Sequence, residues 1–159
     1  MFKRYLIDFI MKAIDIMAGI LMMGAGRMDS VWEFKVRFGE TDAAGIVYYP
    51  NFYKWMDQAT HEMFTGLDMS TRQMLAENKG IPLVEASCQF KHALHFDDQV
   101  RIVTTVAEVK NKVFKLQHVF YLGEIVAAEG YEIRVWIDSS SGNLKAAPIP
   151  DALRSLLLA

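Results

Sequence analysis

The sequence predicts an α+β fold in which one antiparallel sheet of five strands wraps around one long helix. Three observations lead to this prediction. Residues 32–38 alternate between apolar and polar side chains, residues 50–67 repeat apolar side chains at helical spacing, and four later segments alternate again. A chain of 159 residues with 52% hydrophobic residues is the size of a single domain with a substantial core.

Composition and motifs exclude several classes of function. The net charge of −2 gives no electrostatic reason to expect a nucleic-acid partner. Cys88 is the only cysteine, which excludes an intrachain disulfide and a cysteine metal cluster and favours a reducing, cytoplasmic location. His61 and Glu62 lack the H-E-x-x-H spacing of a zinc site, and the P-loop and Rossmann motifs are absent from the sequence. We therefore predict no metal and no separate cofactor.

Residues 1–28 differ from the rest and are predicted to be an N-terminal extension, helical or processed, ahead of a domain at residues 29–159. Lys3 and Arg4 precede an apolar run at residues 16–23. Charged residues interrupt the longer apolar stretch, so it is too polar to span a bilayer, which requires roughly 20 apolar residues. Three interpretations stay open: an amphipathic extension, upstream sequence that the domain does not need, and a targeting or membrane-surface segment.

The first predicted elements are a strand and a loop. Residues 32–38 alternate as a half-buried antiparallel strand does. The apolar residues expected on its inner face are Trp32, Phe34, Val36 and Phe38. The loop of residues 39–49 contains Gly45, which allows backbone conformations or close approaches that a side chain would resist.

Residues 50–67 are predicted to form the long helix. Pro50 suits the first turn, because its missing N–H has no partner to lose there, and Gly66 is the predicted stop. One face of the helix is apolar and is expected to pack against the sheet. The residues of this apolar stripe are Phe52, Trp55, Met56, Ala59 and Met63.

After the long helix we expect a short helix, four strands and a C-terminal helix. Ser70 is the predicted cap of a helix at residues 70–78, and residues 151–158 form the last helix. His118 is predicted to be buried, because it shares a strand face with three large apolar residues. The four strands are expected at residues 84–90, 100–109, 113–122 and 125–138.

Residues 38–57, FGETDAAGIVYYPNFYKWMD, resemble the signature of the 4-hydroxybenzoyl-CoA thioesterase family. The similarity continues to the C-terminal helix, through residues 96–98 and 132–135 among others. It implies a hotdog fold and the hydrolysis of an acyl-CoA to a free acid and CoA. Related thioesterases often carry histidine at the position of Pro50, so its absence moves the resemblance toward the 4-hydroxybenzoyl-CoA type and an aromatic acyl group.

The resemblance implies that Asp42 is catalytic, as nucleophile or general base, and that the backbone N–H of Tyr49 polarises the thioester carbonyl. The start of a helix suits the second role, because its N–H groups are unsatisfied and its dipole is positive there. Outside this motif, an aspartate such as Asp42 would be an ordinary turn residue.

Further residues are expected around the substrate. Gly45 and Trp55 are predicted contacts, and Asp57 matches an aspartate near the acyl group in the family, with a purely structural role as the alternative. Glu40 is expected to be a loop charge and Glu62 to lie on a solvated helix face. Cations should bind the phosphates of CoA. By resemblance these are Lys110, Lys112 and Lys145, although lysines in turns are commonly only solvated.

The family closes its site across a dimer, so we expect a homodimer or homotetramer in which Asp42 of one subunit faces CoA-binding residues of the other. No membrane partner is expected for the domain. Two alternatives are a non-catalytic module that binds acyl-CoA or an acyl carrier, and an acyl-carrier-protein thioesterase. A hotdog dehydratase typically pairs a helix carboxylate with a loop histidine, and residues 39–49 contain none.

Overall fold

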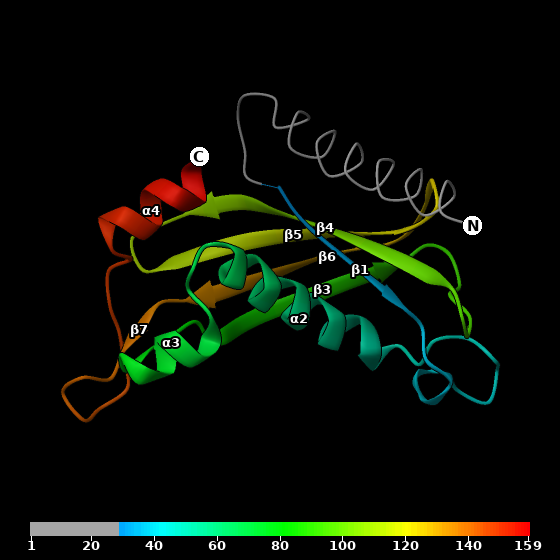
Figure 1. Ribbon diagram of the computed structural model, residues 1–159, viewed down its shortest axis with the longest axis horizontal. Coiled ribbons are helices and arrows are strands. Elements are labelled where there is room, and N and C mark those ends of the chain that lie inside the picture. Colours follow the sequence, from blue (N-terminus) through cyan, green and yellow to red (C-terminus); the bar gives the residue numbers. More distant parts are fainter. Residues whose placement is uncertain (1–28) are drawn as a thin grey trace, which may run out of the picture.

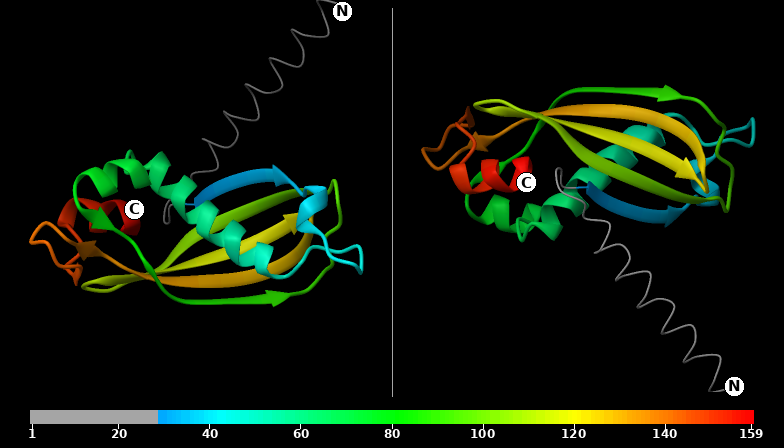
Figure 2. Two further views of the ribbon diagram at one scale, coloured as in Figure 1. Left: turned by 90° about the horizontal axis from the view of Figure 1, so that it is seen from below. Right: turned by 90° about the horizontal axis from the view of Figure 1, so that it is seen from above.

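A computed structural model describes residues 29–159, and the predictions for residues 1–28 lie outside this range. Five antiparallel strands in the order β1-β4-β5-β6-β3 form a curved sheet, and helix α2 crosses its inner face (Figures 1 and 2). The predicted architecture is therefore confirmed. The strands are β1 (Asp29–Lys35), β3 (Leu83–Phe90), β4 (Gln99–Val109), β5 (Val113–Leu122) and β6 (Ile125–Val135).

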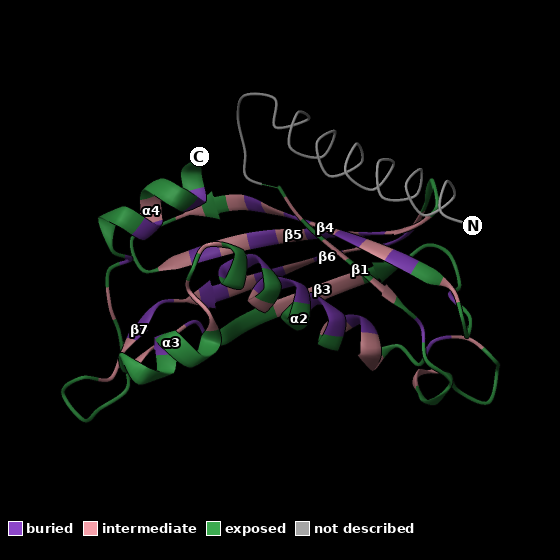
Figure 3. Ribbon diagram, in the orientation of Figure 1, coloured by how far each residue is buried: buried purple, intermediate pink, exposed green. Residues whose placement is uncertain are grey.

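Helix α2 (Pro50–Gly66) begins at the predicted proline and ends at the predicted glycine. Its buried face contains the predicted stripe together with Thr60 and Phe64, and Figure 3 shows this face turned toward the sheet. Burial of that face is what stabilises the helix, because helices of this length are marginal in water on their own.

Two shorter helices lie at the same end of the sheet, opposite the loop of residues 39–49 (Figure 1). α3 (Thr71–Ala76) is capped by Ser70 as predicted, since the Gln73 N–H donates to the serine hydroxyl. α4 (Asp151–Leu158) buries Leu153 and Leu157. None of the helices within residues 29–159 is long and apolar enough to cross a membrane.

The expectation of one strand at residues 125–138 is wrong. β6 ends at Val135, and β7 (Ile137–Asp138) joins a separate small sheet with β2 (Lys79–Gly80) and β8 (Lys145–Ala146). Trp136, only 3% exposed, packs in the core at this point, and its N–H donates to the Lys112 carbonyl at 2.8 Å. The chain therefore passes from the large sheet to the small sheet at Trp136, whose indole is buried in the core.

The predicted inner position of Phe38 is also wrong. β1 ends at Lys35, and the chain turns into a short 3-10 helix, η1 (Phe38–Glu40). Phe38 is 76% exposed, and its ring meets that of Phe96 edge-on at 5.8 Å between centroids. Strand pairing ends at Lys35, and the alternation of buried and exposed side chains continues only through Val36 and Arg37.

The inner face of β6 carries two charged residues, Glu132 and Arg134, beyond the small residues Ala128 and Gly130. Glu132 and Arg134 face α2 and are 1% and 2% exposed, whereas Tyr131, Ile133 and Val135 lie half-buried on the outer face. A period of two predicts a strand, but it does not specify which of the two faces is buried. The site described below depends on Glu132 and Arg134 facing inward.

α2 approaches the sheet closely at Gly130, where a Cβ would lie 2.4 Å from Met56 Sδ and 2.8 Å from the Ser87 carbonyl oxygen. We expect Gly130→Ala to lower the free energy of unfolding by about 1–3 kcal/mol, since the carbonyl belongs to backbone and cannot move freely. Chemical denaturation would measure this. Gly66→Ala is the control, because a Cβ there meets no atom within 4 Å; an equal loss in both variants would contradict the prediction.

Candidate active site

The loop around Asp42 is a tight hairpin. The Asp42 N–H donates to the Ile46 carbonyl and the Gly45 N–H donates to the Asp42 carbonyl, both at 2.9 Å. The Ala44 N–H donates to Asp42 Oδ1 at 2.8 Å. Gly45 has a φ of +77°, in the left-handed region that favours glycine. The carboxylate is exposed, and no donor within residues 29–159 reaches its Oδ2.

Glu40 holds this loop against α2, which its expected role as a loop charge did not anticipate. Its carboxylate accepts the Arg37 N–H at 2.7 Å and the Trp55 Nε1–H at 3.3 Å. Its carbonyl accepts the Tyr48 N–H and an Asn51 side-chain N–H, both at 2.9 Å. The strand end, the loop and the helix start are therefore joined at one residue.

The N–H of Tyr49 is a free donor at the start of α2. Pro50 has no N–H, and the N–H groups of Asn51 and Phe52 donate to carbonyls one turn back. Within residues 29–159 the Tyr49 N–H has no acceptor. It lies at the positive end of a 17-residue helix, beside a cavity of about 300 Å³ that Phe90 also lines. The arrangement suits a carbonyl oxygen that gains negative charge.

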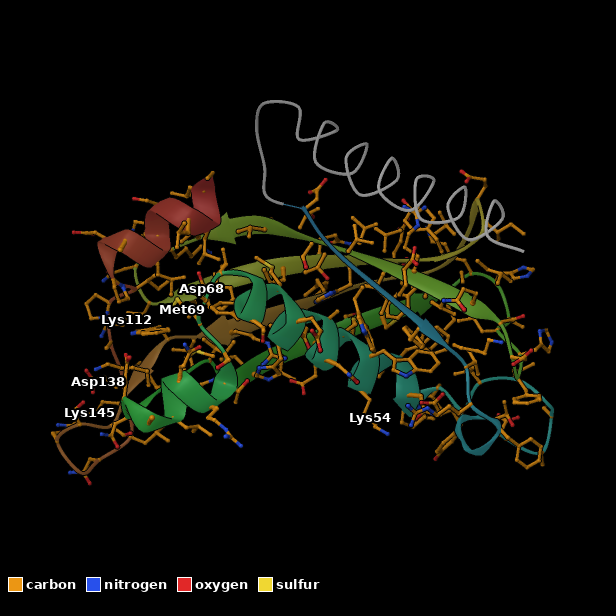
Figure 4. The ribbon with its side chains drawn as sticks, in the orientation of Figure 1. Lys54, Asp68, Met69, Lys112, Asp138 and Lys145 are labelled. Atoms are coloured by element: carbon orange, nitrogen blue, oxygen red, sulfur yellow. The ribbon has the colours of Figure 1, made fainter. Side chains whose placement is uncertain are left out.

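The three predicted lysines lie far from this loop. Lys110 and Lys112 flank the turn between β4 and β5, and Lys145 lies on β8. Figure 4 shows Lys112 and Lys145 at the end of the molecule that carries α3, whereas the loop of Asp42 lies at the opposite end in Figure 1. Lys110 is also paired with Glu108 at 3.3 Å. One chain therefore does not bring the cations to the carboxylate.

Trp55 and Asp57 face different surroundings. Trp55 is 3% exposed and packs in the core between Phe34 and Phe52, with ring centroids 4.6 and 5.5 Å away. Trp55 packs against Phe52, which lines the cavity beside Tyr49. Direct contact between Trp55 and a substrate stays a prediction. Asp57 lines a separate cavity on the α3 side of α2, together with Arg134.

A buried network of charges connects Asp57 to the sheet. Arg134 Nη2 donates to Asp57 Oδ1 at 2.6 Å and to Glu132 Oε2 at 2.9 Å, and the Thr60 hydroxyl donates to the same Glu132 oxygen at 2.6 Å. His118 is buried as predicted, and its Nε2 lies 3.5 Å from Glu132 Oε2 without a hydrogen-bond partner among residues 29–159. The sequence signal for this network is the charged pair two residues apart on one strand.

The surroundings of Glu132 and Cys88 shift the pKa values of these two side chains in opposite directions. Burial by itself would raise the pKa of Glu132, but the neighbouring His118 imidazole, the Arg134 charge and the Thr60 hydroxyl outweigh it and hold that pKa below its ordinary value. Burial raises the pKa of the Cys88 thiol to about 11. Cys88 is therefore protonated at neutral pH and does not provide a thiolate nucleophile.

The described part of the chain lacks a set of side chains that could bind a metal ion. Within residues 29–159, no group of three or more His, Cys, Asp or Glu side chains is arranged to hold a metal ion. The groups available for chemistry are a carboxylate and a backbone donor, which together suit the hydrolysis of an activated acyl group.

The sequence profile of the thioesterase-like superfamily matches residues 36–157. The chain belongs to this superfamily. The match spans the loop, α2, strands β3, β4, β5 and β6, and most of α4. Together with the relatives described next, it confirms the resemblance to 4-hydroxybenzoyl-CoA thioesterases and the prediction of a hotdog acyl-CoA thioesterase.

Three relatives illustrate the range of this superfamily. A solved gentisyl-coenzyme A thioesterase is 48% identical, with a TM-score of 0.72, and the match covers 78% of this chain and 98% of that one. The 4-hydroxybenzoyl-CoA thioesterase of Pseudomonas sp. strain CBS-3 is 27% identical over 73% of this chain and 88% of its own. A 1,4-dihydroxy-2-naphthoyl-CoA hydrolase of Microcystis aeruginosa is 26% identical over 79% of this chain and 91% of its own.

A second structure links the fold to a bound ligand. An aspartate-to-asparagine mutant of 4-hydroxybenzoyl CoA thioesterase, complexed with 4-hydroxybenzoyl CoA, is 25% identical with a TM-score of 0.73. That match covers 81% of this chain and 98% of the other. The names of these relatives share an aromatic acyl group that carries hydroxyls.

Proposed function

We propose that this thioesterase hydrolyses aromatic acyl-CoA thioesters that carry ring hydroxyls, with gentisyl-CoA and 4-hydroxybenzoyl-CoA as the first candidates. One observation carries the proposal: a single loop presents the exposed Asp42 carboxylate and the free Tyr49 N–H, in a chain 48% identical to a gentisyl-coenzyme A thioesterase. The reaction consumes water and releases the aromatic acid and CoA as its thiol. We place this activity in the cytoplasm.

In the proposed mechanism, the thioester carbonyl accepts the Tyr49 N–H and so gains positive character at carbon. Asp42 then either attacks that carbon, giving an acyl anhydride that water hydrolyses, or takes a proton from the water that attacks. The sulfur of CoA leaves and is protonated. As the tetrahedral oxyanion forms, the N–H and the helix dipole stabilise it. Gly45 leaves open space on the side where a Cβ would stand, which suits a close approach by the thioester.

The second half of the site is proposed to come from a partner subunit paired along β3. β3 lies at the edge of the sheet, and its ends carry the exposed apolar residues Leu83, Val84 and Phe90. The ring of Phe90 lies 6.5 Å from that of Tyr49, between centroids, whereas Leu83 lines the Asp57 cavity at the other end. Antiparallel pairing of two β3 strands places one subunit's Tyr49 next to the partner's Asp57 cavity.

The same pairing accounts for the position of the predicted phosphate ligands. Lys110, Lys112 and Lys145 lie at the α3 end of each chain, so in the dimer they come to the Asp42 end of the partner. Lysine ammonium groups bind phosphate as flexible point charges. We therefore propose that each CoA spans two subunits, in a homodimer or in a tetramer built from it.

The substrate class is tested with a panel of CoA thioesters. We expect kcat/KM for gentisyl-CoA and 4-hydroxybenzoyl-CoA to exceed that for straight-chain acyl-CoAs by at least about 100-fold, because differences in the acyl pocket are worth a few kcal/mol. Released thiol is the readout. Tight binding without turnover across the panel would favour a non-catalytic module, and faster turnover of an acyl carrier thioester would favour the acyl-carrier-protein enzyme.

The dimer is tested by placing a charge on the β3 edge. We expect Val84→Lys to raise the dissociation constant of the dimer at least about tenfold, because an edge lysine opposes strand pairing. Light scattering after size exclusion measures the mass, and hydrolysis should fall with it. Val31→Lys on β1 is the matched control, since Val31 is 55% exposed on the opposite edge. A fully active Val84→Lys monomer contradicts the proposed interface.

A further inference from the structure

A cavity of about 520 Å³ lies between α2, α3 and the small sheet, away from the Asp42 of the same chain. Its polar groups gather at one place, where Asp57, His61 and Arg134 meet. In the dimer proposed above, this cavity faces the partner's Tyr49 and can receive the acyl group. The rest of its wall is largely apolar and includes Met74, Leu75, Ile81, Leu83, Ile137 and Leu144.

The buried Arg134 fixes the position of the Asp57 carboxylate in this cavity. Arg134, whose side chain is 3% exposed, donates to Asp57 Oδ1, to Glu132 and to the Ile81 carbonyl at 3.1 Å. The guanidinium is therefore occupied by protein acceptors. Asp57 is 53% exposed in the single chain, and no donor within residues 29–159 reaches its Oδ2. That oxygen is available to accept a hydrogen bond from a ligand.

His61 stands one helical turn beyond Asp57, and its ring is fixed by α3. Its Nδ1 lies 2.7 Å from the Thr71 hydroxyl, and its Nε2 lies 3.5 Å from Asp57 Oδ1. If the threonine donates to Nδ1, the ring proton sits on Nε2, which is the favourable arrangement next to a carboxylate. Nε2–H is then a donor beside the free carboxylate oxygen.

We propose that His61 is a specificity-determining residue that acts with Asp57 as a two-point clamp for a hydroxyl on the acyl group. The hydroxyl donates to Asp57 Oδ2 and accepts from His61 Nε2–H. This inference rests on the proposed function, because it names the feature that the acyl cavity selects. The ligand class is an aromatic acyl-CoA with a hydroxyl at ring position 3 or 4.

The clamp distinguishes a hydroxyl from groups of similar size. A phenolic hydroxyl both donates and accepts, so it satisfies the carboxylate and the imidazole together. An aromatic amine donates well but accepts poorly, so it satisfies Asp57 alone. A ring hydrogen does neither and leaves both partners without a ligand contact. The expected order of kcat/KM is therefore hydroxybenzoyl, aminobenzoyl, benzoyl.

The test compares these three kinds of CoA thioester, substituted at positions 3 and 4, on the full chain and its variants. His61→Leu should reduce the hydroxyl-over-amine preference to near unity, because both substituents then bind Asp57 alone. Asp57→Asn should reduce the hydroxyl-over-hydrogen preference by on the order of tenfold to a hundredfold, as expected for a hydrogen bond to a charged group. His61→Gln keeps a donor and should retain part of the preference.

Glu62→Gln is the matched control, because Glu62 is an exposed neighbour of His61 on α2. Its preferences should equal those of the wild type. Circular dichroism and thermal melting establish that each variant is folded. Unchanged hydroxyl-over-amine and hydroxyl-over-hydrogen ratios in folded His61→Leu and Asp57→Asn would overturn the clamp. Absence of benzoyl-CoA and hydroxybenzoyl-CoA hydrolysis by the wild type would instead overturn the proposed function.

Discussion

Replacement of Asp42 by asparagine is expected to lower kcat by about 10²–10⁴-fold, the range that a general base contributes, and by more if the carboxylate is the nucleophile. Asparagine keeps the Oδ1 that accepts the Ala44 N–H at 2.8 Å, so the hairpin should persist. The loss then reports on chemistry and not on loop structure. KM should change little, because the acyl cavity and the lysines are untouched.

Thiol release under saturating substrate measures this effect, and denaturant unfolding verifies that stability is retained. Asp68→Asn is a matched control at the far end of α2. Its residue has a φ of +57°, a conformation that asparagine also adopts readily. Activity of Asp42→Asn within about twofold of the wild type would remove Asp42 from the catalytic role, because a general base contributes far more than that.

Replacement of Arg134 by methionine is expected to lower the free energy of unfolding by about 3–5 kcal/mol, the usual penalty when one partner of a buried pair is removed. Glu132 is 1% exposed and would keep only the Thr60 hydroxyl and the His118 ring, whose Nε2 lies 3.5 Å away. Its buried charge would then lack a compensating cation. Asp57 would also lose the donor that fixes it in the acyl cavity.

Denaturant midpoints compare this variant with Arg101→Met, whose guanidinium lies 4.6 Å above the Tyr121 ring on the outer face and should contribute about 0.5–1 kcal/mol. The double variant Arg134→Met with Glu132→Leu should recover part of the loss, because an apolar pair can replace a buried ion pair. An unchanged midpoint for Arg134→Met alone would mean that the network does not stabilise the fold.

The same network predicts how stability depends on pH. The pKa of Glu132 is held below its ordinary value in the folded state, so its ionised form stabilises the fold above the pKa of the unfolded chain. This stabilisation is lost as the pH falls through the folded pKa. The Arg134→Met variant loses the cation that lowers this pKa, so its stability should begin to fall at a higher pH than that of the wild type.

Much of the catalytic loop could be predicted from sequence, because its parts are neighbours along the chain. Asp42, Gly45 and the helix start at Pro50 lie within nine positions, and local rules for glycine and helix termini apply directly. The strand that carries His118 was predicted for a similar reason, since one residue among large apolar neighbours of the same parity shares their burial.

The acyl cavity could not be predicted in this way, because its polar groups come from distant segments. Asp57 and His61 lie on α2 and Arg134 lies on β6, and strand pairing brings them together. The predicted lysines illustrate the converse. They were expected to face Asp42 from a partner subunit. In one chain they lie at the opposite end of the molecule from the Asp42 loop, so they reach the site only through the proposed dimer.

The amino-acid order alone therefore defines the strand and helix periods, the α2 stripe and the loop that begins the site, since each depends on spacing between near neighbours. The tertiary arrangement determines which face of β6 is buried, and so whether Glu132 and Arg134 meet water or Asp57. A period of two is equally compatible with either face. Which face is buried depends on what packs against the strand. Here Asp57 and Thr60 of α2 provide polar partners for Arg134 and Glu132.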